Sequence, residues 1–177
     1  MTSYVALLRG INISGQKLIK MEDLRKSFEG MGFKNVRTLI ASGNVLFETS
    51  ASDSGKLAQK IEAGLKKSFG FPVDVILRSL VEIQRILILN PFKDIKVTPE
   101  IRLYVSFLTD KPKTPLKLPY ESPQKDFRIL RTSEREVFSV SMPAPRGRST
   151  GNLMTTIEKA FGKKRSEEHT SELQSQR

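Results

Sequence analysis

The sequence predicts an α+β protein made of two ferredoxin-like halves in tandem, the second lacking its last strand. The hydrophobic patterns in residues 1–78 predict the element order strand, helix, strand, strand, helix, strand, which is that of the split βαβ unit. Residues 79–100 read as a connecting helix and loop, after which residues 101–164 begin the same order again. With 38% hydrophobic residues and no cysteine, the core is expected to form without disulfides.

Hydrophobic spacing and turn residues place each element of the first half. Apolar alternation predicts strands and apolar residues at helical spacing predict helices. The six elements are expected at residues 4–9, 20–31, 36–40, 44–48, 53–69 and 73–78. Gly32 and Gly70 are typical helix stops, and Asp53 or Ser54 is a typical helix cap. Ala41-Ser42-Gly43 is typical of a tight hairpin turn.

The second half follows from similar signals. Ser79 and Glu82 form a capping-box pattern that opens a connecting helix through Leu87, which Asn90-Pro91 ends. Prolines between residues 112 and 123 break any long helix in the connector that follows the next strand. The remaining elements are three strands and a helix, expected at residues 101–107, 127–131, 136–141 and 153–161.

The last residues, 165–177, differ in character from the rest of the chain. Eleven consecutive positions, Arg165 to Ser175, match one reading frame of a sequencing-library adapter. We therefore expect a non-native tail and an interruption of the native chain near Lys164, which would explain the missing closing strand. The alternative is a natural disordered tail. If the adapter interpretation holds, His169, the only histidine, has no function.

The composition excludes several kinds of chemistry. Residues 1–164 contain no His or Cys, which excludes a Ser-His-Asp triad, a Cys nucleophile and a His-ligated zinc. The carboxylates are scattered and the Walker A and Rossmann glycine patterns are absent, so neither a metal nor a cofactor is expected. No apolar run is long enough for a membrane span and no signal peptide is recognisable, which favours a cytoplasmic location without a membrane partner.

The first candidate site is the segment after the first strand, Arg9-Gly10-Ile11-Asn12 with Gly15 and Lys17. Arg9 can bind a phosphate or carboxylate as a planar fork, and the glycines let backbone N–H groups approach an anion. Asn12 supplies a donor and an acceptor. Alternatively, Arg9 pairs with a carboxylate, Asn12 holds a turn and the glycines only permit positive φ. The sequence leaves both interpretations open.

Two further candidates are weaker. Ser42 and Asn44 flank a glycine that is typical of a hairpin turn, and we expect this turn to lie at the opposite end of the sheet from the Arg9 loop. Arg146 and Arg148 precede the last helix, whose N-terminus can attract an anion, but a solvated loop is the alternative. The third strand does not match the aromatic run of RNA-binding sheets, which argues against base stacking there.

An ordered set of short motifs resembles the bacterial family called domain of unknown function 1697, over essentially all of residues 1–164. The motifs are Leu7-Leu8-Arg9-Gly10-Ile11-Asn12, Leu24-Arg25, Gly32-Phe33, Ser42-Gly43-Asn44-Val45, Phe69-Gly70, Arg78-Ser79 and Asn90-Pro91-Phe92. The resemblance implies tandem ferredoxin-like halves and no established activity, cofactor or substrate. Members normally continue into a Thr-Thr-Arg-Asn-Trp-Asn-type segment, whereas this chain has no Trp.

The formal net charge of +11 favours an anionic partner, although a generally basic surface is the alternative. The leading functional hypothesis is a cytoplasmic module that binds a phosphorylated ligand, a nucleotide or nucleic acid. One alternative is an enzyme that positions a small anionic substrate through Arg9 and Asn12. Another is a protein-interaction or structural module. The sequence predicts neither the reaction nor the oligomeric state.

Overall fold

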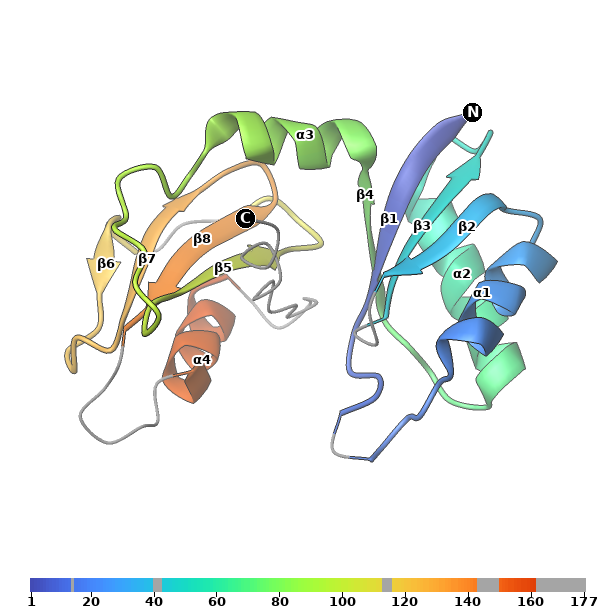
Figure 1. Cartoon of the computed structure of the whole chain (residues 1–177), viewed down its shortest axis with the longest axis horizontal. Coiled ribbons are helices and arrows are strands. Elements are labelled where there is room, and N and C mark those ends of the chain that lie inside the picture. Colours follow the sequence, from blue (N-terminus) through green and yellow to red (C-terminus); the bar gives the residue numbers. More distant parts are fainter. Residues whose placement is uncertain (14, 40–42, 113–115, 143–149, 162–177) are drawn as a thin grey trace. The chain divides into compact units, whose positions relative to one another are not determined.

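The chain divides into two compact units, Met1–Ile88 and Leu89–Arg177. The computed structural model, shown in Figure 1, describes residues 1–13, 15–39, 43–112, 116–142 and 150–161. Within these residues, none of the helices is long and apolar enough to cross a membrane.

The first unit contains a four-stranded antiparallel sheet with the strand order β2-β3-β1-β4, which is the ferredoxin-like order that the sequence predicts. Its elements are β1 (Thr2–Leu8), α1 (Met21–Gly30), β2 (Lys34–Leu39), β3 (Asn44–Thr49), α2 (Ser54–Phe69) and β4 (Val75–Ser79), followed by α3 (Leu80–Leu89), of which all but the last residue belong to this unit. Helices α1 and α2 lie on one face of the sheet (Figure 1). The core between them holds Leu24, Phe28, Phe47, Ile61 and Leu65, all of which are fully buried.

The expected helix caps are present. Gly32 has φ 89° and its N–H donates to the carbonyl of Glu29, so this left-handed glycine terminates α1. The carboxylate of Asp53 accepts from two N–H groups in the first turn of α2, and the left-handed Gly70 ends that helix. The capping box of α3 is also confirmed, because the hydroxyl of Ser79 donates to the carboxylate of Glu82 at 2.9 Å and accepts from its N–H.

The second unit contains another four-stranded antiparallel sheet, with the order β5-β8-β7-β6. Its elements are β5 (Arg102–Phe107), β6 (Tyr120–Glu121), β7 (Phe127–Thr132), β8 (Glu136–Ser141) and α4 (Thr150–Phe161). The apolar residues Leu153 and Ile157 of α4 pack on one face of this sheet, against a cluster that includes Phe127 and Ile129. The three predicted strands and the last helix are therefore confirmed.

Strand β6 is an element that the sequence analysis missed. Only Tyr120 and Glu121 belong to it, and they pair with Ile129 and Arg128 at the edge of the sheet. A strand of two residues has no period from which it can be recognised. In the second unit, this edge strand and the proline-containing connector occupy the part of the chain between β5 and β7.

Candidate functional site

The segment after β1 is anchored on the connection between α2 and β4. We call residues 9–19 the β1-exit loop. The N–H of Arg9 donates to the carbonyl of Asp74 at 2.9 Å. The ammonium group of Lys17 donates to the carbonyl of Pro72 at 3.0 Å and lies 5.9 Å from the ring centroid of Phe71. Both ends of the loop are thereby held by one short segment, residues 71–74.

Asn12 joins the two ends of the loop by hydrogen bonds. Its Oδ1 accepts from the N–H of Ile19 at 2.8 Å, and its Nδ2 donates to the carbonyl of the same residue at 3.1 Å. The N–H of Asn12 also donates to the carbonyl of Lys17 at 3.2 Å. The side-chain amide thus replaces a backbone partner, which is the turn-holding role that the sequence left open for Asn12.

Four of the loop residues that the structure describes have left-handed backbone, namely Gly10 (φ 68°), Asn12 (φ 55°), Gly15 (φ 75°) and Lys17 (φ 47°). Successive N–H groups in such a backbone can form a concave donor surface for an anion. Within the described part of the chain, the N–H groups of Gly10 and Ile11 donate to no acceptor. Gly10 is exposed, so a ligand can approach this part of the loop.

The turn between β2 and β3 lies at the same end of the sheet as the β1-exit loop, so the expectation that they lie at opposite ends is wrong. Asn44, the first residue of β3, pairs with Leu7 near the end of β1. Because β1 and β3 are antiparallel, β3 must begin where β1 ends. The expected candidates Arg9, Gly10, Asn12 and Asn44 therefore belong to one end of the first sheet.

Gly43 fits directly against the β1-exit loop. It is buried and has φ 87°, and a Cβ atom added to it would lie 2.5 Å from Cδ1 of Ile11. The same atom would lie 3.2 Å from Cβ of Leu8. Glycine is required here for both its conformation and its small volume, so the hairpin turn helps to shape the loop.

Asn44 has a buried acceptor at this end of the sheet. Its Oδ1 accepts no hydrogen bond within the described part of the chain. Leu7 pairs with Asn44 and, like Arg9, projects toward the face of the sheet that lies away from α1 and α2. An unsatisfied buried acceptor is costly, so a donor group of a ligand would lower the free energy at this position.

The face of the first sheet away from the helices carries positive side chains from three strands. Strand alternation places Arg37 of β2 and Arg78 of β4 on it, together with Arg9 at the end of β1. Arg37 is exposed, whereas Arg78 is fully buried and donates to the carbonyl of Leu77 at 2.9 Å.

Aromatic residues of the first sheet lie on the other face. Tyr4 and Phe47 stack with their ring centroids 6.0 Å apart in the core beneath the helices. In the described part of β1 to β4, the face away from the helices carries no aromatic side chain. Bases of a nucleic acid would therefore find no stacking platform on these strands.

Ser42, Arg146 and Arg148 lie outside the residues that the structure describes. Sequence reasoning missed Asp74 as a neighbour of the candidate site. It could have been found by pairing the first and fourth predicted strands in antiparallel order.

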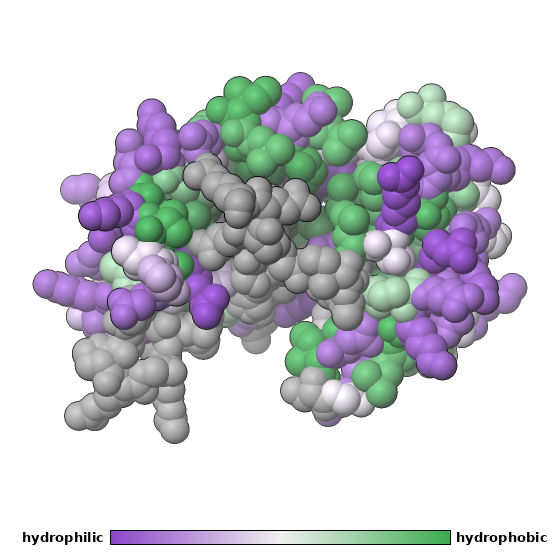
Figure 2. Space-filling view, in the orientation of Figure 1, coloured by the Kyte–Doolittle hydropathy of each residue, from purple (hydrophilic) through white to green (hydrophobic). Residues whose placement is uncertain are grey.

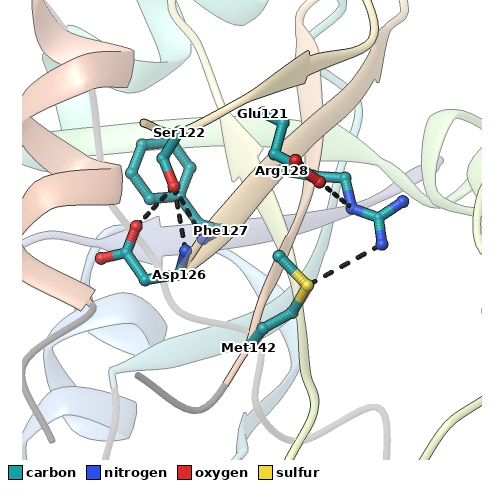
Figure 3. A network of polar contacts seen from close by, with 6 residues as sticks. All are labelled: Glu121, Ser122, Asp126, Phe127, Arg128 and Met142. Atoms are coloured by element: carbon teal, nitrogen blue, oxygen red, sulfur yellow. Dashed lines mark hydrogen bonds and ion pairs between the residues drawn. The ribbon is translucent and has the colours of Figure 1, made fainter. Parts of the chain in front are cut away.

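A second polar network closes the turn between β6 and β7 (Figure 3). The hydroxyl of Ser122 donates to the carboxylate of Asp126 at 2.5 Å and accepts from the N–H groups of Asp126 and Phe127. Ser122 and Asp126 are each 2% exposed. Because the hydroxyl of Ser122 already acts as a donor and as an acceptor within the protein, this network stabilises the turn and is not a candidate ligand site.

Acidic and metal-binding side chains do not gather anywhere in the described part of the chain. Across residues 1–13, 15–39, 43–112, 116–142 and 150–161, no group of three His, Cys, Asp or Glu side chains could hold a metal ion. The polar groups at the end of the first sheet are mainly donors of Arg, Lys and backbone N–H, which suit an anion better than a cation.

Comparisons with known proteins agree with this architecture. A search of curated proteins found no match to the chain. The conserved bacterial protein SP0830 from Streptococcus pneumoniae has a similar structure, with a TM-score of 0.64 and 22% sequence identity over 90% of this chain and 82% of that chain. At that identity the likeness shows the fold alone. Residues 1–138 match the family described as "Protein of unknown function (DUF1697)". The chain therefore belongs to the DUF1697 family.

Proposed function

We propose that the protein is a cytoplasmic module that binds a small phosphate-bearing ligand, such as a nucleotide, at the β1-exit loop. One observation carries the proposal. The N–H groups of Gly10 and Ile11, which follow Arg9 directly, have no acceptor within the described residues, whereas the amide of Asn12 is engaged in holding the loop. Two consecutive N–H groups beside a guanidinium form a donor set that suits a phosphate oxygen.

The charge of the chain supports an anionic ligand. The formal net charge of +11 raises the local concentration of anions around the protein. Arg9 and Lys17 place two positive side chains in the β1-exit loop. A phosphate that reaches Gly10 is therefore attracted by the charges of both residues.

Asn44 narrows the chemistry of the ligand. Its buried Oδ1 is an acceptor without a donor in the described part of the chain, and a phosphate oxygen cannot satisfy it. A hydroxyl or amino group can. The ligand that fits both features carries a phosphate and a hydrogen-bond donor, as a nucleotide or a sugar phosphate does.

A small ligand is favoured over a nucleic acid. Single-stranded nucleic acids are usually bound by aromatic side chains on which bases stack. Tyr4 and Phe47, the aromatic residues in β1 and β3, are buried on the helix side of the sheet. An enzyme would additionally need an acid or a base near the ligand. Asp74 contacts the loop, but it does so through its backbone carbonyl.

We also propose that the two units are a duplicated ferredoxin-like fold. The order β5-β8-β7 repeats the order β1-β3-β2 when each unit is numbered from its own first strand. Helix α4 follows β8 as α2 follows β3. In this alignment, residues 101–164 form the second, incomplete ferredoxin-like half that the sequence predicts.

Titration by nuclear magnetic resonance tests the ligand proposal. Inorganic phosphate, AMP and ATP would be added at low salt to the isotope-labelled chain. We expect the amide signals of Gly10 and Ile11 to shift with AMP or ATP. Loss of one charge-assisted contact in Arg9→Ala should weaken binding by roughly 10-fold to 100-fold.

The matched control is Arg25→Ala, since Arg25 is a partly exposed arginine on α1 that pairs with Glu29. This variant should bind AMP and ATP as the original chain does. Equal weakening in the two variants would indicate attraction by net charge alone. Absence of any shift at Gly10 and Ile11 with all three probes would refute the proposal.

A further inference from the structure

Helix α3 exposes large apolar side chains. Ile88 is 83% exposed, Leu87 57%, Val81 53% and Leu80 39%, whereas Ile86 is buried. Figure 2 shows hydrophobic residues gathered over α3. Burial of such side chains is favourable and monomers rarely expose them together, so this helix has the character of an interaction surface.

Five exposed residues of α3 form one stripe, whereas Leu89, which is also exposed, lies outside it. Residues three and four positions apart share a face of a helix. Leu80, Gln84 and Leu87 follow this spacing, and Val81 and Ile88 lie beside them on the same face. Ile86 points to the opposite side, where it is buried. We call these five exposed residues the α3 stripe.

The α3 stripe is symmetric about its middle residue. Gln84 lies at the centre, with Val81 and Leu87 three positions away and Leu80 and Ile88 four positions away. In an antiparallel pair of identical helices related by a two-fold axis at Gln84, Leu80 faces Ile88 and Val81 faces Leu87. A two-fold interface requires such self-complementarity.

We propose that the α3 stripe pairs with the same stripe of a second copy of this chain, in antiparallel orientation about Gln84. The stripe itself contains no charged side chain, so no charge is buried at its centre. The two Gln84 amides can hydrogen-bond to each other across the axis, since an amide offers both donor and acceptor.

The area of the α3 stripe determines the expected dissociation constant of the dimer. The four apolar side chains expose roughly 400 Å² in each copy, which is in the range of functional patches on monomers. With the stems of neighbouring residues, two copies would bury about 1,000 Å², near the lower limit for a specific interface. A reversible dimer with a dissociation constant in the micromolar range is the expected result.

Single cysteines test the arrangement, because the chain contains no cysteine of its own. Gln84→Cys places two thiols at the two-fold axis, within the roughly 4–7 Å Cα separation that a disulfide spans. Under mild oxidation it should form a linked dimer at least about tenfold faster than Lys66→Cys, an exposed control on α2. A mixture of Leu80→Cys and Ile88→Cys should form the mixed link in preference to either self-link.

Sedimentation equilibrium of the full chain tests the same proposal without oxidation. Ile88→Glu should raise the dissociation constant of the dimer at least about tenfold, since it places two carboxylates in the contact. Val97→Glu, which replaces a residue that is 54% exposed outside α3, should leave it unchanged. A chain that stays monomeric at millimolar concentration, or equal cross-linking at positions 84 and 66, overturns the proposal. Binding of a monomer to lipid vesicles through Ile88 overturns it as well.

Discussion

Replacement of Asn12 by alanine should destabilise the first unit, because Asn12 holds the β1-exit loop closed. Its amide makes two hydrogen bonds to the backbone of Ile19, at 2.8 and 3.1 Å, and its backbone has φ 55°. Alanine removes both bonds. It also places a residue without a side-chain hydrogen bond in a left-handed conformation that only glycine adopts without strain.

The magnitude follows from these two contributions. A net hydrogen bond contributes about 1 kcal/mol, so the two bonds to Ile19 contribute about 2 kcal/mol. A left-handed alanine costs about 1 kcal/mol more. We expect Asn12→Ala to lower the free energy of unfolding by about 3 kcal/mol, the sum of these estimates. Asn12→Gly loses the bonds but avoids the strain, so it should lose about 2 kcal/mol.

Urea unfolding followed by circular dichroism measures these changes, since the chain has no Trp to serve as a fluorescent reporter. Hydrogen exchange adds a local measurement, because the N–H of Ile19 loses its acceptor in both variants and should exchange at least about tenfold faster. Asn12→Asp keeps an acceptor for this N–H and should retain more protection than alanine. Unchanged unfolding and unchanged protection of Ile19 in Asn12→Ala would refute the reasoning.

Three further predictions concern other positions. Gly43→Ala adds a methyl group 2.5 Å from Cδ1 of Ile11 at φ 87°, and urea unfolding should show that the free energy of unfolding falls by about 2–3 kcal/mol. Gly15→Ala, at φ 75° with open space around it, should lower the free energy of unfolding by only about 1 kcal/mol. Ser122→Ala leaves buried N–H groups and the carboxylate of Asp126 without their partner, so calorimetry should show a loss of about 2–3 kcal/mol. Burial raises the pKa of Tyr104, so its neutral form stabilises the fold below about pH 10, and this stabilisation is lost as the pH rises through the folded-state pKa. Tyr104→Phe should reduce this alkaline loss of stability, which unfolding curves between about pH 9 and 12 would measure.

The sequence predicts the helices and their ends well because those signals are local. The cap of α2 depends on Asp53 and the N–H groups of Gly55 and Lys56, and the end of α2 depends on Gly70. The capping box of α3 spans only Ser79 to Glu82. Each is a complete hydrogen-bonding unit within a few residues, so no knowledge of the tertiary structure is needed to recognise it.

Features that depend on pairing between distant segments could not be recognised in the same way. Strand β6 exists because Tyr120 and Glu121 reach the edge of β7, and its two residues have no pattern of their own. The Ser122 network depends on the tight turn that this pairing creates. The arginines on the outer face of the first sheet come from separate strands, and only the observed register places Arg37 and Arg78 on the same face.

The role of Gly43 explains why the candidate site was only partly predicted. In the sequence, Gly43 is typical of a hairpin turn, and that interpretation accounts for its left-handed φ. It does not account for the 2.5 Å space between its hypothetical Cβ and Ile11, which is a property of the β1-exit loop. Gly43 and Ile11 lie more than thirty positions apart in the sequence. Antiparallel pairing of β1 with β3 brings them together, so Gly43, which shapes the loop beside Gly10 and Asn12, belongs to a different element of the fold. A substitution at Gly43 should therefore alter the proposed ligand site.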